Sequence, residues 1–123
     1  MAEFNRYQIY MLLNQPKPLW LPGVNLEGVD LRGLDLKDAY LPNAILIDAN
    51  MNGVDLSGAN LRSALMQNAH LNDANLTNAN LVGADLRGAS LRKANMTGAD
   101  IMGSNTVGAS MPGAILPDGT TSD

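Results

Sequence analysis

Residues 59–88 read ANLRS ALMQN AHLND ANLTN ANLVG ADLRG, which is six groups of five residues that share one pattern. Each group begins with alanine and has leucine or methionine at its third position. A period of five fits neither the 3.6-residue repeat of an α-helix nor the two-residue alternation of a β-strand. It suits a chain that turns a corner every five residues, with two side chains of each group pointing inward.

The same spacing runs without insertion or deletion through twenty groups, whose third residues extend from Leu21 to Leu116. Thr106 is the single third residue that is not large and aliphatic. The first residue of each group is apolar except at Ser104, and from Ala39 onward it is mostly alanine. One group alone cannot bury its large side chain, whereas stacked groups bury a continuous column. The repeat therefore predicts a solenoid filled by columns of small and large apolar side chains.

The remaining positions carry the residues that corners need. Glycine often follows two residues after the large apolar one, as at Gly23, Gly28 and Gly33, and Asn or Asp often separates the two apolar residues. Gly, Asn and Asp tolerate the backbone angles of tight turns better than other residues do. We therefore expect the fifth residue of each group to form the corner.

Groups such as residues 59–63, 74–78, 79–83 and 84–88 follow the pattern A(D/N)LXX, so that residues 19–118 resemble the pentapeptide-repeat family. The resemblance implies an all-β fold, a right-handed quadrilateral β-helix with four pentads in each coil. Five coils would form a rod roughly 24 Å tall, at about 4.8 Å between stacked strands. Members of this family are numerous in cyanobacteria.

The two ends of the chain differ from the repeat. Residues 3–13 predict a short α-helix, because Phe4, Tyr7 and Met11 fall on one face and prolines follow. Such a helix would cover the backbone groups that a β-helix exposes at its end; the alternative is a protruding helix that docks a partner. The expected organisation is a helical cap and proline-containing connector over residues 1–18, the β-helix over residues 19–118, and a polar tail over residues 119–123.

If residues twenty apart stack, the sequence also maps the outer surface. Ile45 then stacks on Leu65 with Ile47 beside it, at positions that elsewhere are mostly polar, and such a patch often marks an interface. Trp20 stacks on Tyr40, and both residue types are frequent interface anchors. A tolerated surface patch, or packing against the N-terminal segment, is the alternative explanation. These five residues form the candidate partner surface.

Nothing in the sequence predicts catalysis. His70 is the only histidine and there is no cysteine, so that neither a metal-binding pair nor a catalytic dyad is available. Leucine and alanine columns leave no concave polar site inside the coil. We therefore predict no enzyme activity, no catalytic or metal-binding residue and no cofactor.

Charge and hydropathy argue against a nucleic-acid partner, a membrane span and a secretory signal. A net charge of −4 and a sequence pI near 4.7 argue against direct nucleic-acid binding. No apolar run approaches the roughly 18 residues of a membrane span, and residues 9–13 lack the cleavage site of a secretory signal. A cytoplasmic protein with a protein partner is the expectation.

Three functions fit these observations. The first is a non-enzymatic interaction or scaffolding module that presents rigid, flat faces. The second, implied by the family's gyrase-targeting members, is a DNA mimic that binds DNA gyrase. Asp35 stacked on Asp55 would then imitate phosphates, although Asn75 and Asn95 continue that column and are expected to bond from coil to coil. The third is a structural spacer tethered through the N-terminal helix. The tail is too short for the dimerisation helix of the gyrase-targeting members, which slightly favours a monomer.

Overall fold

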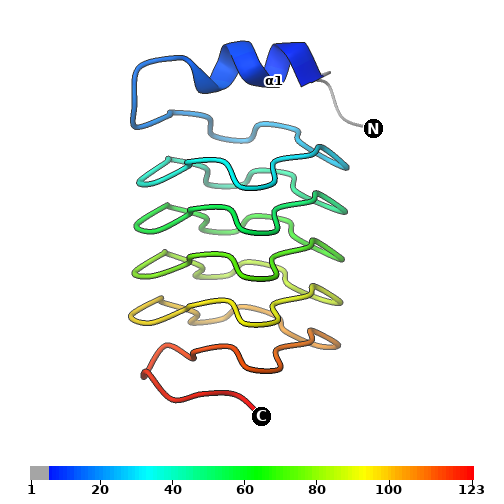
Figure 1. The fold of residues 1–123 in the computed structure, drawn as a ribbon, viewed down its shortest axis with the longest axis vertical. Helices are drawn as coiled ribbons and strands as arrows, with labels where there is room; N and C mark the ends of the chain where they lie inside the picture. The colour runs from blue at the N-terminus through cyan, green and yellow to red at the C-terminus, as the bar shows by residue number, and fades with distance from the viewer. Residues whose placement is uncertain (1–5) are drawn as a thin grey trace.

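The computed structural model describes residues 6–123, which form a stack of square coils beneath one helix (Figure 1). The helix α1, Arg6–Leu13, is the only helix or extended strand that the described chain contains. Below it the chain winds downward coil by coil, so that α1 and the C-terminal segment lie at opposite ends of the stack (Figure 1). No helix in the described chain has the length and apolar character needed to cross a membrane.

Parallel β-bridges hold the coils together, each joining a residue to the one twenty positions further along. The bridge residue is the second of each pentad. In the middle of the stack, Leu61 N donates to Asn80 O at 2.7 Å, and Asn80 N donates back to Ala59 O at 2.9 Å. A period of twenty residues places four pentads in each coil, one on each side of the square. The predicted β-helix solenoid is therefore confirmed.

The corner lies at the fifth residue of each pentad. From Gly23 to Gly113 every such residue has a φ between 56° and 74°, in the left-handed region. Glycine reaches this region without strain, and Asn and Asp tolerate it better than other side chains do. The turn is closed by one backbone bond, as where Ala64 N donates to Leu61 O at 3.0 Å. The expected role of Gly, Asn and Asp at the corners is confirmed.

The first and third residues of the pentads fill the interior. Alanines at the first position and leucines or methionines at the third are almost completely buried through the middle of the stack. No polar or charged residue is buried among the described ones. Because these columns leave no polar cavity inside the coil, any binding site has to lie on the outer faces or at the ends.

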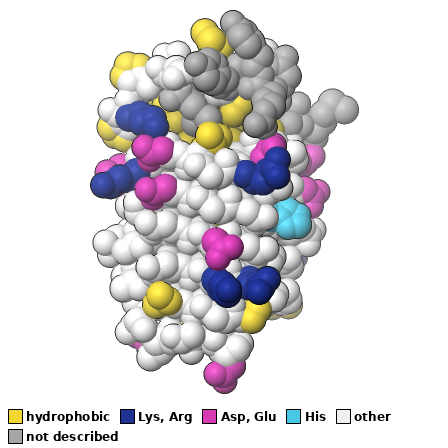
Figure 2. Space-filling view, in the orientation of Figure 1, with side chains coloured by type: hydrophobic (Ala, Val, Ile, Leu, Met, Phe, Trp, Pro, Cys, Tyr) yellow, Lys and Arg dark blue, Asp and Glu magenta, His cyan; other side chains and the backbone are white. Residues whose placement is uncertain are grey.

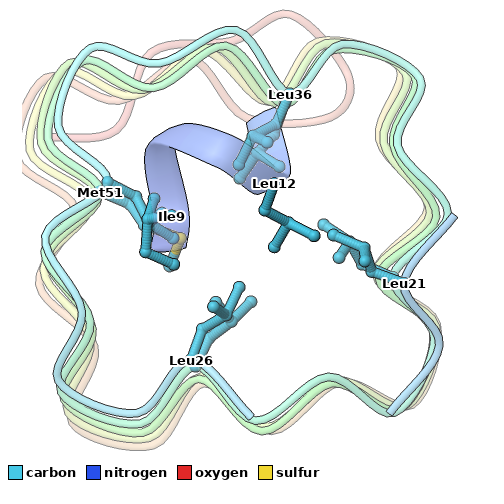
Figure 3. Close-up of a pocket in the computed structure, with 10 residues that line it drawn as sticks. Ile9, Leu12, Leu21, Leu26, Leu36 and Met51 are labelled. Atoms are coloured by element: carbon cyan, nitrogen blue, oxygen red, sulfur yellow. The ribbon is translucent and has the colours of Figure 1, made fainter. Parts of the chain in front are cut away.

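Helix α1 lies across the first coil and directs Ile9 and Leu12 into its open end (Figure 3). The space between these two side chains and the leucine columns is about 10 Å³, no more than one water molecule needs. The sequence predicted a helix over residues 3–13 with a different inward face. Residues 3–5, with Phe4 among them, lie outside the described residues, and Met11 is exposed rather than packed on the coil.

Candidate functional site

A side-chain hydrogen bond stabilises the turn in most pentads. The oxygen of the second residue accepts from the backbone N–H of the fourth, as where Asn60 Oδ1 accepts from Arg62 N at 3.0 Å. Asn and Asp form such bonds to the backbone two residues ahead readily. The same bond is made by Asn25, Asp30, Asp35, Asn50, Asp55, Asn75, Asn80, Asp85, Asn95, Asp100 and Asn105.

The expected asparagine ladder from coil to coil is therefore wrong for this column, because Asn75 and Asn95 bond within their own pentads. Bonds between coils occur instead at fourth residues. Asn52 Oδ1 accepts from Asn72 N at 2.9 Å, and Asn72 Oδ1 accepts from Arg92 N at 3.0 Å. These two bonds serve pentads whose second residue is His or Ser.

Proline provides another solution where the second residue has no suitable oxygen. Trp20 and Tyr40 are followed at the fourth position by Pro22 and Pro42, which have no N–H to satisfy. The same pairing recurs at Ser110 with Pro112 and at Ile115 with Pro117.

Two pentads have no Asn or Asp acceptor for the fourth-position N–H, either in the same pentad or in the neighbouring coil, and no proline at the fourth position. Among the described pentads, only Ile47 and Gln67 have a fourth-position N–H that no protein oxygen accepts. Both follow an aliphatic second residue, Ile45 and Leu65 respectively. The Gln67 Oε1 atom is also buried without a hydrogen-bond partner. Buried polar atoms without a partner are rare in native structures, so that Gln67 Oε1, beside two N–H groups that no protein oxygen accepts, marks this site as unusual.

The predicted surface residues lie around these donors. Ile45 and Leu65 are neighbours in one bridge column, and Leu65 is 37% exposed, whereas Ile45 and Ile47 are half-buried. Trp20 and Tyr40 occupy the adjacent side of the square. Their rings stack with centroids 4.0 Å apart and planes 16° apart.

Trp20 is 71% exposed, so the described part of the N-terminal segment does not cover it. The packing partner of the indole is Tyr40. Aliphatic and aromatic groups thus occupy two adjacent sides of the first coils.

An ion pair borders the surface on its C-terminal side. Asp85, the bridge partner of Leu65, accepts from Arg87 with Nη2 at 2.6 Å from Oδ2. This hydrogen bond is the main reason why the pKa of Asp85 lies below its ordinary value, while the same contact raises the pKa of Arg87. Charged side chains of both signs also lie side by side on the face that Figure 2 shows.

The ion pair predicts a pH dependence of stability. A carboxyl whose pKa is lower in the folded than in the unfolded chain stabilises the fold above its unfolded pKa of about 3.9. That contribution is lost as the pH falls through the lowered folded value. We expect the urea midpoint of the wild type to fall below about pH 4, and that of Asp85→Asn to fall less. Asp73→Asn, at an exposed carboxyl without an ion pair among the described residues, should retain the wild-type slope.

Chemical sites are not evident in the part of the chain that the structure describes. No three His, Cys, Asp or Glu side chains there are grouped so that they could hold a metal ion. His70 is exposed in the bridge column between Asn50 and Ser90.

Sequence reasoning found the apolar residues of this surface but missed its free donors. The signal is present in the sequence only when residues twenty apart are compared. The pentads AILID and ALMQN lack Asn or Asp at the second position and Pro at the fourth, and they also lack an Asn twenty residues before the fourth position, which serves AHLND and ASLRK.

Comparison with known proteins gives one clear result. A family model described as pentapeptide repeats, in 8 copies, matches residues 21–58, 55–92, 69–105 and 79–116. No curated protein matches the sequence significantly.

Solved structures give the same picture. HetL, a pentapeptide repeat protein involved in heterocyst differentiation regulation from the cyanobacterium Nostoc sp. strain PCC 7120, is 33% identical with a TM-score of 0.84 over 87% of this chain. The matched part is 51% of HetL, so that this chain spans about half of its length. Rfr23 from the cyanobacterium Cyanothece 51142 is 36% identical, with a TM-score of 0.41, over 80% of this chain and 63% of that one. A pentapeptide repeat protein of the Arabidopsis thaliana thylakoid lumen is 27% identical, with a TM-score of 0.44, over 90% and 74% of the two chains.

Proposed function

We infer the function from the premise that this chain belongs to the pentapeptide-repeat family. We propose that it is a non-enzymatic interaction and scaffolding module, whose rigid β-helix faces bind a protein partner. The docking surface that we propose consists of Ile45, Ile47, Leu65, Trp20 and Tyr40. The observation that carries this proposal is the pair of free N–H groups at Ile47 and Gln67, which lie next to the aliphatic side chains.

The two donors favour binding over a neutral surface patch. In the other pentads, an Asn or Asp side chain accepts a hydrogen bond from the fourth-position N–H, or Pro at the fourth position has no N–H. The fourth-position donors of those pentads therefore need no partner from outside the protein. At Ile47 and Gln67 an aliphatic residue replaces the acceptor, which leaves the N–H to water. A partner that supplies a carbonyl or carboxylate oxygen would satisfy the donors while its apolar groups cover Ile45 and Leu65. Interfaces combine an apolar centre with hydrogen bonds in this way.

Trp20 and Tyr40 extend the surface around the corner of the coil. Large aromatic side chains dominate the binding energy of many interfaces. The stacked pair is already held by its ring contact and by the backbone ladder beneath it. A partner would therefore order few side chains here, which lowers the entropic cost of association.

The experiment is an affinity capture from native lysate with the wild-type chain and two double variants. Ile45→Asp/Leu65→Asp removes the apolar groups and adds charge. Ile45→Asn/Leu65→Asn removes them without charge and introduces the residue that other pentads carry at this position. Because Asn and Asp are common there, both variants should fold. We expect a stoichiometric protein that is recovered with the wild type and reduced at least tenfold with both variants.

A matched control changes charge on the opposite side of the square. Asn75→Asp/Asn95→Asp introduces two carboxylates at second positions while keeping the turn bond, and it should leave capture unchanged. Equal recovery of the partner by wild type and by both Ile45/Leu65 variants would exclude this surface.

The gyrase alternative has weaker support. The chain is acidic, but Asp30 pairs with Arg32 at 2.8 Å and Asp35 lies 3.4 Å from Lys17 Nζ. A duplex backbone presents uncompensated charges at regular spacing, whereas these carboxylates lie next to cations. Inhibition of DNA supercoiling by gyrase at micromolar protein would favour the mimic, and no inhibition would remove it.

The spacer alternative requires an N-terminal helix that is free to tether. Ile9 of α1 is instead buried against the first coil, which favours a cap. Loss of the captured partner on deleting residues 1–16, with the fold retained, would support the tether.

A further inference from the structure

The C-terminal edge of the coil stack is partly paired on two sides of the square and open on the other two. In the coil before it, Leu81 N donates to Asp100 O at 2.7 Å and Gly83 N donates to Met102 O at 2.9 Å. The equivalent N–H groups of the last coil have no acceptor among the described residues. On the two open sides these free donors belong to Ile101, Gly103, Thr106 and Gly108; on the other two sides, Met111 N and Asp118 N also have no backbone acceptor.

On the other two sides the chain's own tail forms part of the missing pairs. Gly113 N donates to Ser122 O at 3.0 Å, Leu116 N donates to Thr120 O at 2.7 Å, and Ser122 N donates to Ala114 O at 2.7 Å. The bridge between Ile115 and Thr121 is antiparallel, because the tail turns back beneath the last coil (Figure 1). The tail therefore shows which kind of strand this edge accepts, and it leaves the sides of residues 101–103 and 106–108 uncovered.

The open sides are also apolar. Ile101 occupies the inward third position, yet it is 38% exposed, whereas Leu81 in the same column is completely buried. Met102 and Val107, at fourth positions, are each 73% exposed. An exposed strand edge beside apolar side chains is a template for pairing with another chain.

The charges of the last coil and the tail have one sign. Their charged residues are Asp100, Asp118 and Asp123, whereas the cations Arg87 and Lys93 lie one coil earlier, above Val107 and Gly113. Asp100 is the second residue of the first open side and is exposed. A ligand that carries positive charge would therefore complement this end of the molecule.

We propose that the open edge binds an extended, basic segment of another polypeptide as an antiparallel strand. Its backbone oxygens accept from Ile101, Gly103, Thr106 and Gly108. Alternate apolar side chains cover Ile101, and Lys or Arg side chains point outward toward Asp100. Because the edge turns a corner between residues 103 and 106, the segment needs a flexible residue such as glycine at the bend. Main-chain pairing of this type provides affinity, and alternate side chains provide specificity.

A second copy of this chain fits the edge less well. Two last coils brought end to end would place Asp100 and Asp118 of both copies together, without a cation in the last coil of either. Stacking head to tail is blocked, because α1 covers the first coil with Ile9 and Leu12 (Figure 3).

The test uses the full chain and a short fluorescent peptide of alternating valine and lysine with one central glycine. Amide exchange measured by NMR should show the four free N–H groups unprotected in the protein alone and protected once the peptide binds. Leu81 N and Gly83 N, which are already paired, should be protected in both states. The same peptide with glutamate in place of lysine should bind at least about tenfold more weakly, a difference of about 1.4 kcal/mol.

Variants separate this edge from other surfaces. Met102→Lys/Val107→Lys adds positive charge at exposed fourth positions and should weaken binding of the lysine peptide on the order of tenfold. Val82→Lys makes the same kind of change at the fourth position directly before Met102 in the column, where the edge is paired, and should bind as wild type does.

Three results would overturn the proposal. The first is binding without new protection of the four amides, and the second is equal affinity for the lysine and glutamate peptides. The third is a protein dimer in sedimentation that Met102→Lys/Val107→Lys dissociates, which would assign the edge to a second copy. None of these results bears on the Ile45 and Leu65 surface, so the two proposals are tested separately.

Discussion

Replacing Leu81 by alanine is expected to lower the free energy of unfolding by about 2–5 kcal/mol. The side chain is completely buried at the third position of a pentad in the middle of the stack. Its truncation removes apolar burial and leaves a cavity, and the backbone ladder on both sides keeps the coil from collapsing into that space. The urea midpoint, with the slope of the transition compared with that of the wild type, measures the loss.

The matched control for this substitution is Ile101→Ala, in the same column one coil further along. Ile101 is 38% exposed at the open edge, so that less burial is lost and no closed cavity forms. We expect a loss of less than about half that of Leu81→Ala. Leu61→Ala, at a buried site one coil earlier, should match Leu81→Ala. Equal and small losses at all three sites would mean that the leucine columns are not the core.

Enlarging Ala79 to leucine is expected to cost about 1–3 kcal/mol by overpacking. Ala79 is almost completely buried at the first position of its pentad, beside the leucine columns. The backbone around it pairs with coils on both sides, since Asp100 N donates to Ala79 O at 3.0 Å and the neighbouring Asn80 N donates to Ala59 O at 2.9 Å. The coil therefore cannot widen to make room for a larger side chain without breaking backbone hydrogen bonds between the coils.

Ala99→Leu provides the comparison at the open end. Ala99 occupies the same column one coil further along and is slightly exposed. The added atoms have room below the last coil, so the loss of stability should be well under that of Ala79→Leu. Thermal or urea unfolding of the two variants measures both losses. An Ala79→Leu protein as stable as the wild type would contradict the prediction that the alanine column leaves no room for a larger side chain.

The proposed docking surface illustrates how far sequence reasoning reaches. A period of five residues, together with the four pentads per coil that the family resemblance implied, predicted that Ile45 stacks on Leu65 and Trp20 on Tyr40, and the bridges show these neighbours. The free N–H groups of Ile47 and Gln67 required the hydrogen bonds of every other pentad for comparison. The local turn bonds of Asn75 and Asn95 were likewise missed, because a column of identical residues also suits bonds between coils.

The helix and the two ends of the stack were predicted least well. The sequence indicated a helix near the N-terminus but not that Ile9 and Leu12 would be the residues pointing into the coil. Near the C-terminus it indicated a polar tail but not that Thr121 would pair with Ile115. Such contacts are made once and have no periodic counterpart against which they can be checked.

The sequence by itself determined the architecture of this protein in outline, because each pentad repeats the same local requirement. The corner residues and the alanine and leucine columns follow from that period, whereas the outward neighbours follow from the four pentads in each coil that the family resemblance implied. Only the tertiary structure decided which backbone groups remain without partners at Ile47, Gln67 and the open edge. Satisfaction of a donor depends on where side chains from other pentads and the returning tail lie in space, and a repeating local pattern does not specify those contacts.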